Sequence, residues 1–164
     1  MTITLHPIGH VRGGRSAIVD DDWGRVEAVI ELDPARFTKE ALLGLDAFSH
    51  AEIIYLFDRV PEDRIETGAR HPRGRKDWPR VGIFAQRGKN RPNRLGLTTC
   101  EVLRLEGTRL VVRGLDAVDA TPVLDIKPVM SGFAPRGELR EPDWARAIMA
   151  QYWERAEAPE GPPQ

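Results

Sequence analysis

The sequence predicts a mainly β domain of the α+β class, a compact barrel-like fold with short helices rather than a doubly wound Rossmann sheet. Several short segments show strand periodicity or continuous apolar character, whereas only two show a helical pattern. No Gly-x-Gly-x-x-Gly motif follows any of the expected strands. The chain of 164 residues is long enough for one domain with a sizeable core.

The expected strands of the N-terminal part are residues 5–11, 25–32 and 50–58. In 25–32 apolar and polar residues alternate strictly, which is typical of a half-buried strand. Residues 50–58 are the most apolar, so we expect this strand at the centre of the sheet. Between the last two strands, Asp33 can cap a short helix whose first position suits Pro34.

The stretch 81–99 has the most unusual pattern of the chain. It opens with the apolar run 81–85, which predicts a buried strand, and it returns to strand character at 95–99. The loop between them carries four Arg or Lys residues, and Pro92 restricts its backbone. Binding and catalysis concentrate in loops of this kind, which a rigid scaffold holds.

The C-terminal part predicts a hairpin, a last strand and a helix. The hairpin joins 97–105 to 109–115, the strand covers 122–129, and the helix covers 142–157 with Trp144, Ile148 and Tyr152 on its apolar face. We expect residues 1–157 to form one domain. Residues 158–164, rich in Pro and Gly, are expected to be a disordered tail.

Charge is distributed unevenly, although the net charge is only −1. From Arg64 to Arg94 ten Lys or Arg residues face two acids, a net charge of +8, and the other residues carry −9. Such a separation favours an anionic partner for one surface. The alternative is that these cations pair with acidic residues elsewhere in the fold.

The composition also bears on compartment and metals. The single cysteine, Cys100, excludes an internal disulfide, so a reducing cytoplasm is expected. The apolar runs are too short to span a bilayer, and the N-terminus lacks the features of a secretory signal. The four histidines have no spacing typical of a metal site, so we expect neither membrane association nor a metal ion.

A second unusual stretch, 116–127, places Asp116, Asp119, Asp125 and Lys127 around a turn with a proline. Carboxylates at strand ends can accept hydrogen bonds from ribose hydroxyls, an ammonium group or an adenine amine. The structural alternative is turn chemistry for the first two and an internal Asp125–Lys127 ion pair. Both interpretations remain open on the sequence alone.

Five motifs taken together resemble the TsaA-like family of S-adenosylmethionine-dependent methyltransferases, whose best-known members are the TrmO-type tRNA N6-methyltransferases. The resemblance extends from about residue 5 to residue 130. The motifs are PIGHVR (7–12), LDAFSHAEIIYLF (45–57), HPRG (71–74), VGIFAQRGKNRPNRLGLTT (81–99) and GLDAVDATPVLDIKP (114–128).

The resemblance implies a β-barrel and a homodimer that binds S-adenosyl-L-methionine near the subunit interface. It also implies methyl transfer to N6 of threonylcarbamoyl-adenosine beside the tRNA anticodon. The positions that match the family's cofactor-binding residues are Arg87, Leu97, Arg113, Gly114, Leu115 and Asp116. Two further segments correspond to cofactor-binding positions but diverge from the family pattern: Asp22, Trp23, Gly24, and Asp58, Arg59.

Chemistry is consistent with these positions. Arg87 can bind the cofactor carboxylate with its guanidinium fork, and Asp116 can meet the ammonium group or the ribose. Leu97 and Trp23 could sandwich the adenine. Taken by itself, Trp23 is more often a core residue, and this alternative is the favoured one. The candidates for orienting or deprotonating the acceptor are Asp119, Asp125 and Lys127. The candidates for binding the acceptor are Arg73, Lys89, Arg91, Asn93 and Arg94.

The chain departs from the family pattern at two positions, since Arg94 stands where proline is usual and Ala120 where glycine is usual. It resembles the family's short branch, so the resemblance implies the cofactor more strongly than the acceptor. The alternatives to a tRNA methyltransferase are an enzyme acting on a small anionic molecule and a non-catalytic S-adenosylmethionine- or RNA-binding module. No aromatic-rich platform accompanies the basic residues in the sequence, which argues against specific readout of single-stranded RNA.

Overall fold

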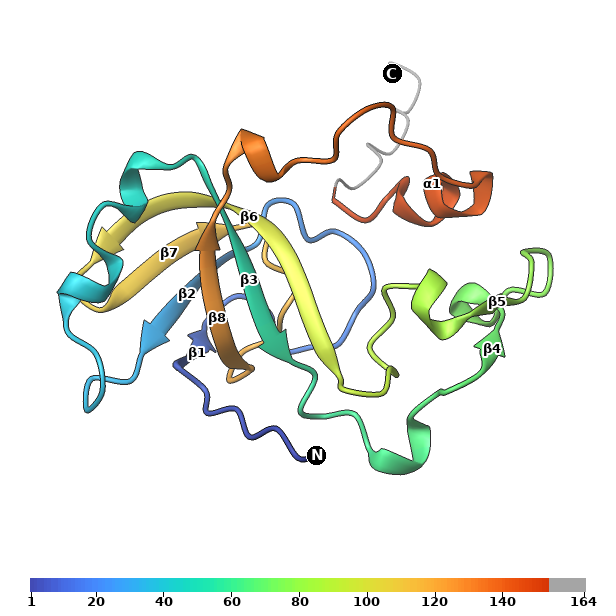
Figure 1. The fold of residues 1–164 in the computed structure, drawn as a ribbon, viewed down its shortest axis with the longest axis horizontal. Helices are drawn as coiled ribbons and strands as arrows, with labels where there is room; N and C mark the ends of the chain where they lie inside the picture. Colours follow the sequence, from blue (N-terminus) through green and yellow to red (C-terminus); the bar gives the residue numbers. More distant parts are fainter. Residues whose placement is uncertain (154–164) are drawn as a thin grey trace, which may run out of the picture.

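The computed structural model describes residues 1–153 and contains a closed six-stranded antiparallel β-barrel (Figure 1). The order around the barrel is β1-β2-β7-β6-β3-β8, and pairing between β8 and β1 closes it. The mainly β, barrel-like prediction is therefore confirmed. The strands are β1 (Gly9–Arg12), β2 (Glu27–Leu32), β3 (His50–Leu56), β6 (Leu95–Glu106), β7 (Arg109–Arg113) and β8 (Pro122–Pro128).

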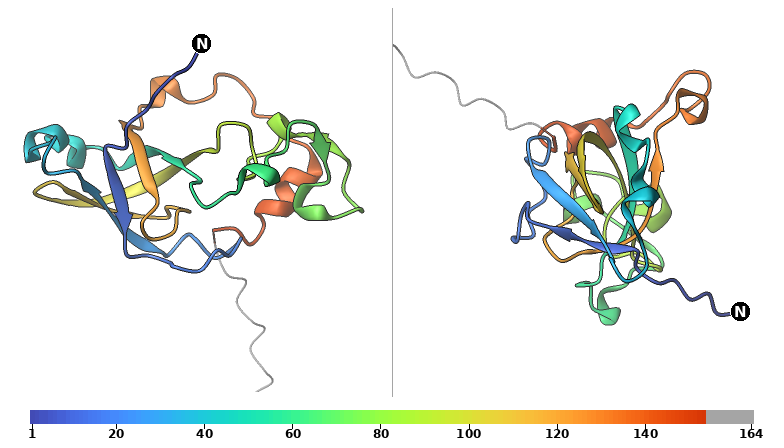
Figure 2. Two further views of the ribbon diagram at one scale, coloured as in Figure 1. Left: turned by 90° about the horizontal axis from the view of Figure 1, so that it is seen from below. Right: turned by 90° about the vertical axis from the view of Figure 1, so that its left-hand side faces the viewer.

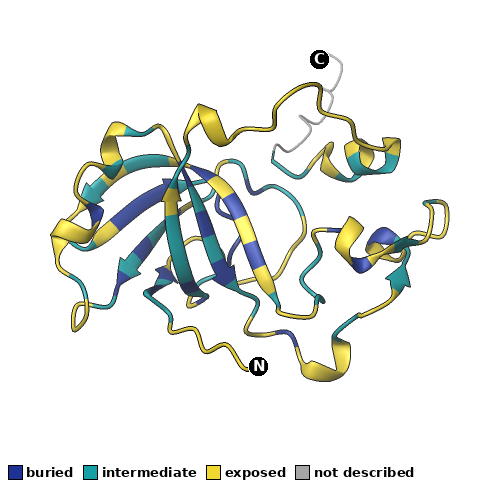
Figure 3. Cartoon of the chain, viewed as in Figure 1, coloured by how far each residue is buried: buried dark blue, intermediate teal, exposed yellow. Residues whose placement is uncertain are grey.

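The core lies inside the barrel because alternate residues of each strand point inward. In β3, for example, Ala51, Ile53 and Tyr55 are buried while the residues between them are partly exposed, an alternation that Figure 3 shows along the strands. Residues from β1, β2, β7 and β8 complete this core: Val11, Ala28, Ile30, Leu32, Leu110, Val112 and Val123.

The other elements are short. The small sheet of β4 (Ala69–Arg70) and β5 (Val81–Gly82) gathers with helix α1 (Asp143–Met149) at one end of the barrel (Figure 1, Figure 2). No helix in residues 1–153 is long and apolar enough to cross a bilayer. The 3-10 turns are η1 (Lys39–Leu42), η2 (Leu45–Ala47), η3 (Glu62–Arg64), η4 (Pro72–Gly74), η5 (Ile83–Ala85) and η6 (Ser131–Phe133).

Three element predictions need correction. The buried strand expected at 81–85 is only the two residues of β5, followed by η5, which leaves Phe84 77% exposed. The helix expected from Asp33 is a turn followed by η1 and η2, with Gly44 in the left-handed region between them (φ 84°). The C-terminal helix ends at Met149. Residues 154–164, which include the rest of that helix and the expected tail, lie outside the described residues.

The two departures from the family pattern both have a positive φ. Arg94 has a φ of 53°, and its N–H donates to the Arg91 carbonyl at 2.9 Å. Proline could satisfy neither condition, because its ring fixes φ near −65° and removes the N–H. The loop of this chain therefore has a conformation that a proline at position 94 would exclude.

Ala120 has a φ of 68° and is exposed, so its Cβ is strained without any compensating contact in the core. We expect Ala120→Gly to raise the free energy of unfolding by about 0.5–1 kcal/mol, since relief of strain exceeds the extra entropy of the unfolded chain. Chemical denaturation measures this change. Ala134→Gly is the matched control, because Ala134 has an extended backbone (φ −63°) and should lose stability instead. A loss at both positions would contradict the strain at Ala120.

Candidate functional site

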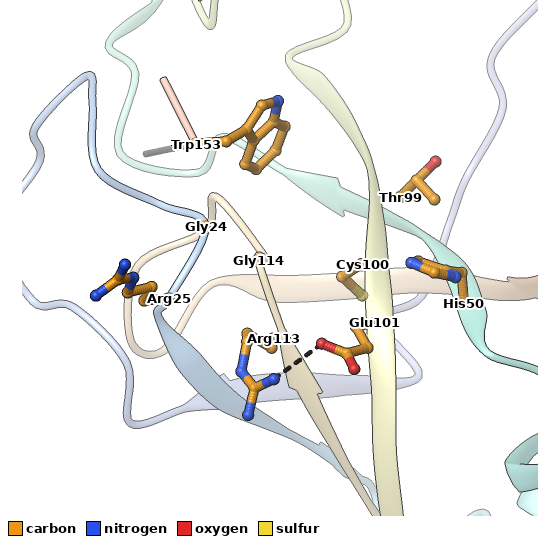
Figure 4. A pocket seen from close by; sticks show the side chains of 9 residues that line it. All are labelled: Gly24, Arg25, His50, Thr99, Cys100, Glu101, Arg113, Gly114 and Trp153. Carbon is orange, nitrogen blue, oxygen red and sulfur yellow. Dashed lines mark hydrogen bonds and ion pairs between the residues drawn. The ribbon is translucent and has the colours of Figure 1, made fainter. Parts of the chain in front are cut away.

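The first half of β6 has an unpaired edge. Within the described chain, residues 95–100 pair with β3 only, because β7 joins β6 from Glu101 onward. Backbone groups along such an edge are available to other partners. A cavity of about 310 Å³ opens next to it, a volume at the lower end of ligand sites (Figure 4). Its lining residues are Gly24, Arg25, His50, Thr99, Cys100, Glu101, Arg113, Gly114 and Trp153.

Three hydroxyl groups hold the Asp116 carboxylate. The Tyr55 hydroxyl donates to Oδ1 at 2.8 Å and the Thr98 hydroxyl donates to the same oxygen. The Tyr152 hydroxyl donates to Oδ2. Burial, and then the neighbouring carboxylate, raise the pKa of both tyrosine hydroxyls far above the usual value. Both hydroxyls therefore stay protonated and act as donors to Asp116 at neutral pH.

The cation-rich loop and the aspartate-bearing turn meet at β6. The guanidinium group of Arg87 donates to the carbonyl of Leu97, and Asp116 accepts from the side chain of the next residue, Thr98. The Leu97 side chain is 43% exposed and is available to a ligand. The structure thus brings Arg87, Leu97 and Asp116 together at β6, although none of the three lines the cavity, and their roles in binding stay predictions.

The loop that ends in Gly24 is tightly held. The Trp23 side chain is only 3% exposed, its Nε1 donates to the Val19 carbonyl at 3.2 Å, and the Arg15 guanidinium lies 4.7 Å from its ring centre. Arg15 also donates to the carbonyl of Asp22, which has a left-handed φ of 66°. This burial favours the core alternative for Trp23, because its ring offers no open face to an adenine.

In the segment from Arg113 to Leu115, the side chains are already engaged or buried. Arg113 pairs with Glu27 at 2.8 Å and with Glu101 at 3.0 Å, so its charge is already balanced. Gly114 has a φ of 80° and lines the cavity. Leu115 is fully buried in the barrel core. Gly114 is buried and its N–H already donates to the Val26 carbonyl at 3.0 Å, so its remaining backbone atoms are what it offers to a ligand in the cavity.

Asp119 and Arg59 tie the 116–121 turn to the N-terminal loop. The Asp119 carboxylate accepts from the Gly13 N–H at 2.8 Å, and the Asp119 carbonyl accepts from the Arg59 guanidinium at 2.8 Å. Asp58 lies two residues beyond the end of β3, and its N–H donates to the Leu56 carbonyl at 2.8 Å. These contacts correspond to the turn chemistry that the sequence left open for Asp119.

Asp125 and Lys127 pair with each other on β8, with 2.9 Å between Oδ2 and Nζ. The hydrogen bond that Lys127 donates to Asp125 raises the pKa of the Lys127 ammonium group, so Lys127 is held protonated and is poorly suited to accept a proton. Strand β3 separates β8 from β6, so the pair does not lie at the β6 edge where Arg87 meets Asp116. The structure thus favours the internal ion pair over the catalytic interpretation.

The basic segment, residues 64–94, is poorly compensated. Within residues 1–153 it forms two ion pairs, Arg73 with Asp21 at 2.8 Å and Arg75 with Asp77. Only the first uses an acid from outside the segment. Among the described residues, Arg73 is therefore the cation of this segment that pairs with an acid elsewhere in the fold. The segment as a whole retains a positive surface.

The other predicted acceptor residues have mixed surroundings. Arg91 and Arg94 are half-buried and donate to the carbonyls of Gln86 at 3.0 Å and Val60 at 2.9 Å, so they support the loop. Lys89 is half-buried and Asn93 is exposed. Two of the five residues expected to bind the acceptor, Arg91 and Arg94, thus hold the loop in place.

Two aromatic residues lie together beside the basic segment, a pair that the sequence did not indicate. Trp78 and Trp144 line a second cavity of about 400 Å³ together with Pro79, Asp143 and Ala147. The Arg75 guanidinium lies 4.2 Å from the centre of the Trp78 ring. Sequence reasoning missed this pair because the two tryptophans are far apart in the chain.

Four residues near Asp116 were not predicted as site residues: Tyr55, Thr98, Tyr152 and Trp153. The inward alternation of the strands could have indicated Tyr55 and Thr98, since both follow the buried pattern of β3 and β6. Tyr152 was placed on the face of the C-terminal helix, which ends before it. In residues 1–153 no group of three or more His, Cys, Asp or Glu side chains is arranged to hold a metal ion.

Comparison with known proteins identifies the family. Residues 21–134 match the tRNA-methyltransferase O N-terminal domain, so the chain belongs to this family and the resemblance seen in the sequence is confirmed. A relative from Pseudomonas aeruginosa, "Putative S-adenosylmethionine-dependent methyltransferase RcsF", is 38% identical over 162 residues, which is 93% of this chain and 66% of the relative. The mouse tRNA (adenine(37)-N6)-methyltransferase is 34% identical over 95 residues, 58% of this chain and 22% of that protein.

The fold is also that of a solved relative. A crystal structure of TrmO from P. aeruginosa superposes with a TM-score of 0.70 and 28% identity, covering 88% of this chain and 62% of that one. The chain therefore spans two thirds or less of the length of these three relatives.

Proposed function

We propose that this chain is an S-adenosylmethionine-dependent methyltransferase that acts on N6 of an adenosine in tRNA. The observation that carries the proposal is the meeting of Arg87 and Asp116 at adjacent residues of β6, the strand whose next residues, Thr99 and Cys100, line the cavity. The cofactor has a carboxylate, an ammonium group, a ribose and an adenine, and these groups need a cation, an anion and an apolar surface close together. The residues present fit that requirement.

Each of these residues has a part in the proposed site. Arg87 would bind the carboxylate, Asp116 the ammonium group or a ribose hydroxyl, and the backbone of Gly114 an edge of the adenine. Leu97 would pack against the adenine ring. The cofactor supplies a methyl group on a positively charged sulfur. The protein accelerates the transfer chiefly by holding the acceptor nitrogen in line with that group.

The specific adenosine that we propose as the methyl acceptor is threonylcarbamoyl-adenosine next to the anticodon. The poorly compensated basic segment supports an RNA partner, since phosphate contacts dominate RNA affinity. The Trp78–Trp144 cavity beside it suits an unpaired base, which stacks on aromatic rings. Asp119, in the same turn as Asp116, is the candidate for orienting the acceptor. These features favour RNA over the alternative of a small anionic acceptor.

A homodimer in the cytoplasm is the assembly that we propose. Leu95 and Leu97 are both exposed on the outward face of β6. Exposed apolar side chains gathered on one face are typical of a protein–protein interface. Analytical ultracentrifugation measures the oligomeric state directly.

Transfer of a labelled methyl group from S-adenosylmethionine into total tRNA tests the proposal. We expect label in tRNA that carries threonylcarbamoyl-adenosine and none in tRNA from cells that lack this modification. Label in both would place the acceptor at an unmodified adenosine. If neither tRNA is labelled, the proposal that the chain methylates tRNA is refuted, whether or not a small anionic molecule takes up the label. Binding to tRNA should also weaken steeply as salt rises.

A further inference from the structure

The segment Gln151–Trp153, which follows α1, docks onto the loop that ends in Gly24. Three consecutive N–H groups of that loop donate to three consecutive carbonyls of the segment: Asp22 to Gln151 at 3.3 Å, Trp23 to Tyr152 at 2.9 Å and Gly24 to Trp153 at 2.8 Å. A Cβ on residue 24 would lie 2.0 Å from the Trp153 carbonyl oxygen. Only glycine permits this approach, so the loop is matched to the segment that covers it.

Tyr152 gives the segment a direct contact with Asp116. The barrel supplies two donors to Oδ1, from Tyr55 and Thr98, whereas Tyr152 is the donor to Oδ2 within the described chain. Without the Tyr152 hydroxyl, Oδ2 loses its partner and the carboxylate can turn away from the site. Tyr152 thus acts on a ligand through Asp116, as a positioning residue.

Trp153 forms one side of the cavity beside β6. Figure 4 shows its indole on one side and the Arg113–Glu101 pair on the other, with Gly24 and Gly114 between them. The Tyr152 ring supports it in an edge-to-face contact, with 4.9 Å between ring centres. Since Trp23 is buried, Trp153 is the tryptophan whose ring borders the cavity. An indole face in a cavity is suited to stacking on a nucleobase.

We infer that the segment Gln151–Trp153 completes the cofactor site, with Tyr152 positioning the Asp116 carboxylate and Trp153 providing the aromatic wall for the adenine. This inference rests on the proposed cofactor, S-adenosylmethionine. It assigns residues outside the region that matches the family, which ends at residue 134. It also replaces Trp23 by Trp153 as the aromatic partner of the adenine.

Titration calorimetry of the full-length chain with S-adenosylmethionine tests the inference. We expect Trp153→Ala to weaken binding about 10-fold or more, with most of the affinity recovered in Trp153→Phe, because a second aromatic ring restores stacking. Tyr152→Phe should weaken binding about 10-fold, since it removes a hydrogen bond to a charged oxygen. Gln151→Ala is the matched control, because it removes an exposed side chain and keeps the backbone contact; its affinity should be unchanged.

Tryptophan fluorescence adds a signature that a merely structural role would not produce. The cofactor should quench the emission of the unsubstituted chain and of Trp144→Phe, and this quenching should be largely lost in Trp153→Phe. Unchanged or tighter binding in Tyr152→Phe and Trp153→Ala, with the unsubstituted chain binding normally, would overturn the inference and leave the proposed function intact. Absence of binding to the unsubstituted chain would overturn both.

Discussion

Asp116→Asn is expected to weaken S-adenosylmethionine binding about 100-fold, equivalent to about 2.7 kcal/mol, and to reduce methyl transfer to background. The carboxylate accepts from Tyr55, Thr98 and Tyr152, and an asparagine offers only one oxygen to these three hydroxyls. The substitution also removes the negative charge proposed to meet the cofactor's ammonium group. Calorimetry measures the affinity, and labelled methyl transfer measures the activity.

The control for this substitution is Asp46→Asn. Asp46 lies exposed in η2, on an element remote in sequence from the proposed site, and removing its charge should leave cofactor affinity within about 2-fold, as is usual for exposed positions. Thermal denaturation of both variants separates a loss of binding from a loss of folding. Cofactor affinity of Asp116→Asn equal to that of Asp46→Asn would remove Asp116 from the site.

Gly96→Ala is expected to have the largest effect on stability, a loss of about 3 kcal/mol. A Cβ at this position would lie 2.3, 2.4 and 2.8 Å from three atoms of the Tyr55 ring. Tyr55 is 1% exposed and packs edge-to-face on Phe57 at 5.3 Å, so the ring cannot move aside without disturbing the core. Any shift of the ring also draws its hydroxyl away from Asp116. Chemical denaturation and cofactor titration should therefore both change.

Gly132→Ala is the matched control for Gly96→Ala, because a Cβ there would meet nothing within 4 Å. It should leave the free energy of unfolding within about 0.5 kcal/mol of the unsubstituted chain. A loss below about 1 kcal/mol for Gly96→Ala would show that the barrel accommodates the added methyl group, contrary to the close packing described for β3 and β6.

The strands of the barrel were predictable because their signals are local. Alternation in 25–32 and the hairpin at Gly107 predicted β2, β6 and β7, and the apolar run at 50–58 predicted β3. Closure of the barrel depends on pairing between β8 and β1, which lie far apart in the sequence. The alternation of apolar and polar residues within a strand does not indicate which distant strand it pairs with. The run 81–85 failed as a strand for the same reason, since its partner β4 has only two residues.

The candidate site was predictable in part. The meeting of Arg87 and Asp116 was expected from two motifs, and the structure brings both to β6. The donors to Asp116 were not expected, because they come from the inward face of the barrel and from a segment beyond α1. The choice between Trp23 and Trp153 depends on burial, which a residue's identity does not reveal.

The central claim is that Arg87 and Asp116 together bind one molecule of S-adenosylmethionine at β6. Titration of that cofactor into the unsubstituted chain and into Arg87→Ala tests it most directly. The claim predicts saturable binding of one cofactor per chain, which Arg87→Ala weakens by about 10-fold or more, since it removes a charged hydrogen bond to the carboxylate. Equal affinity of the two proteins, or no binding to the unsubstituted chain, would contradict it.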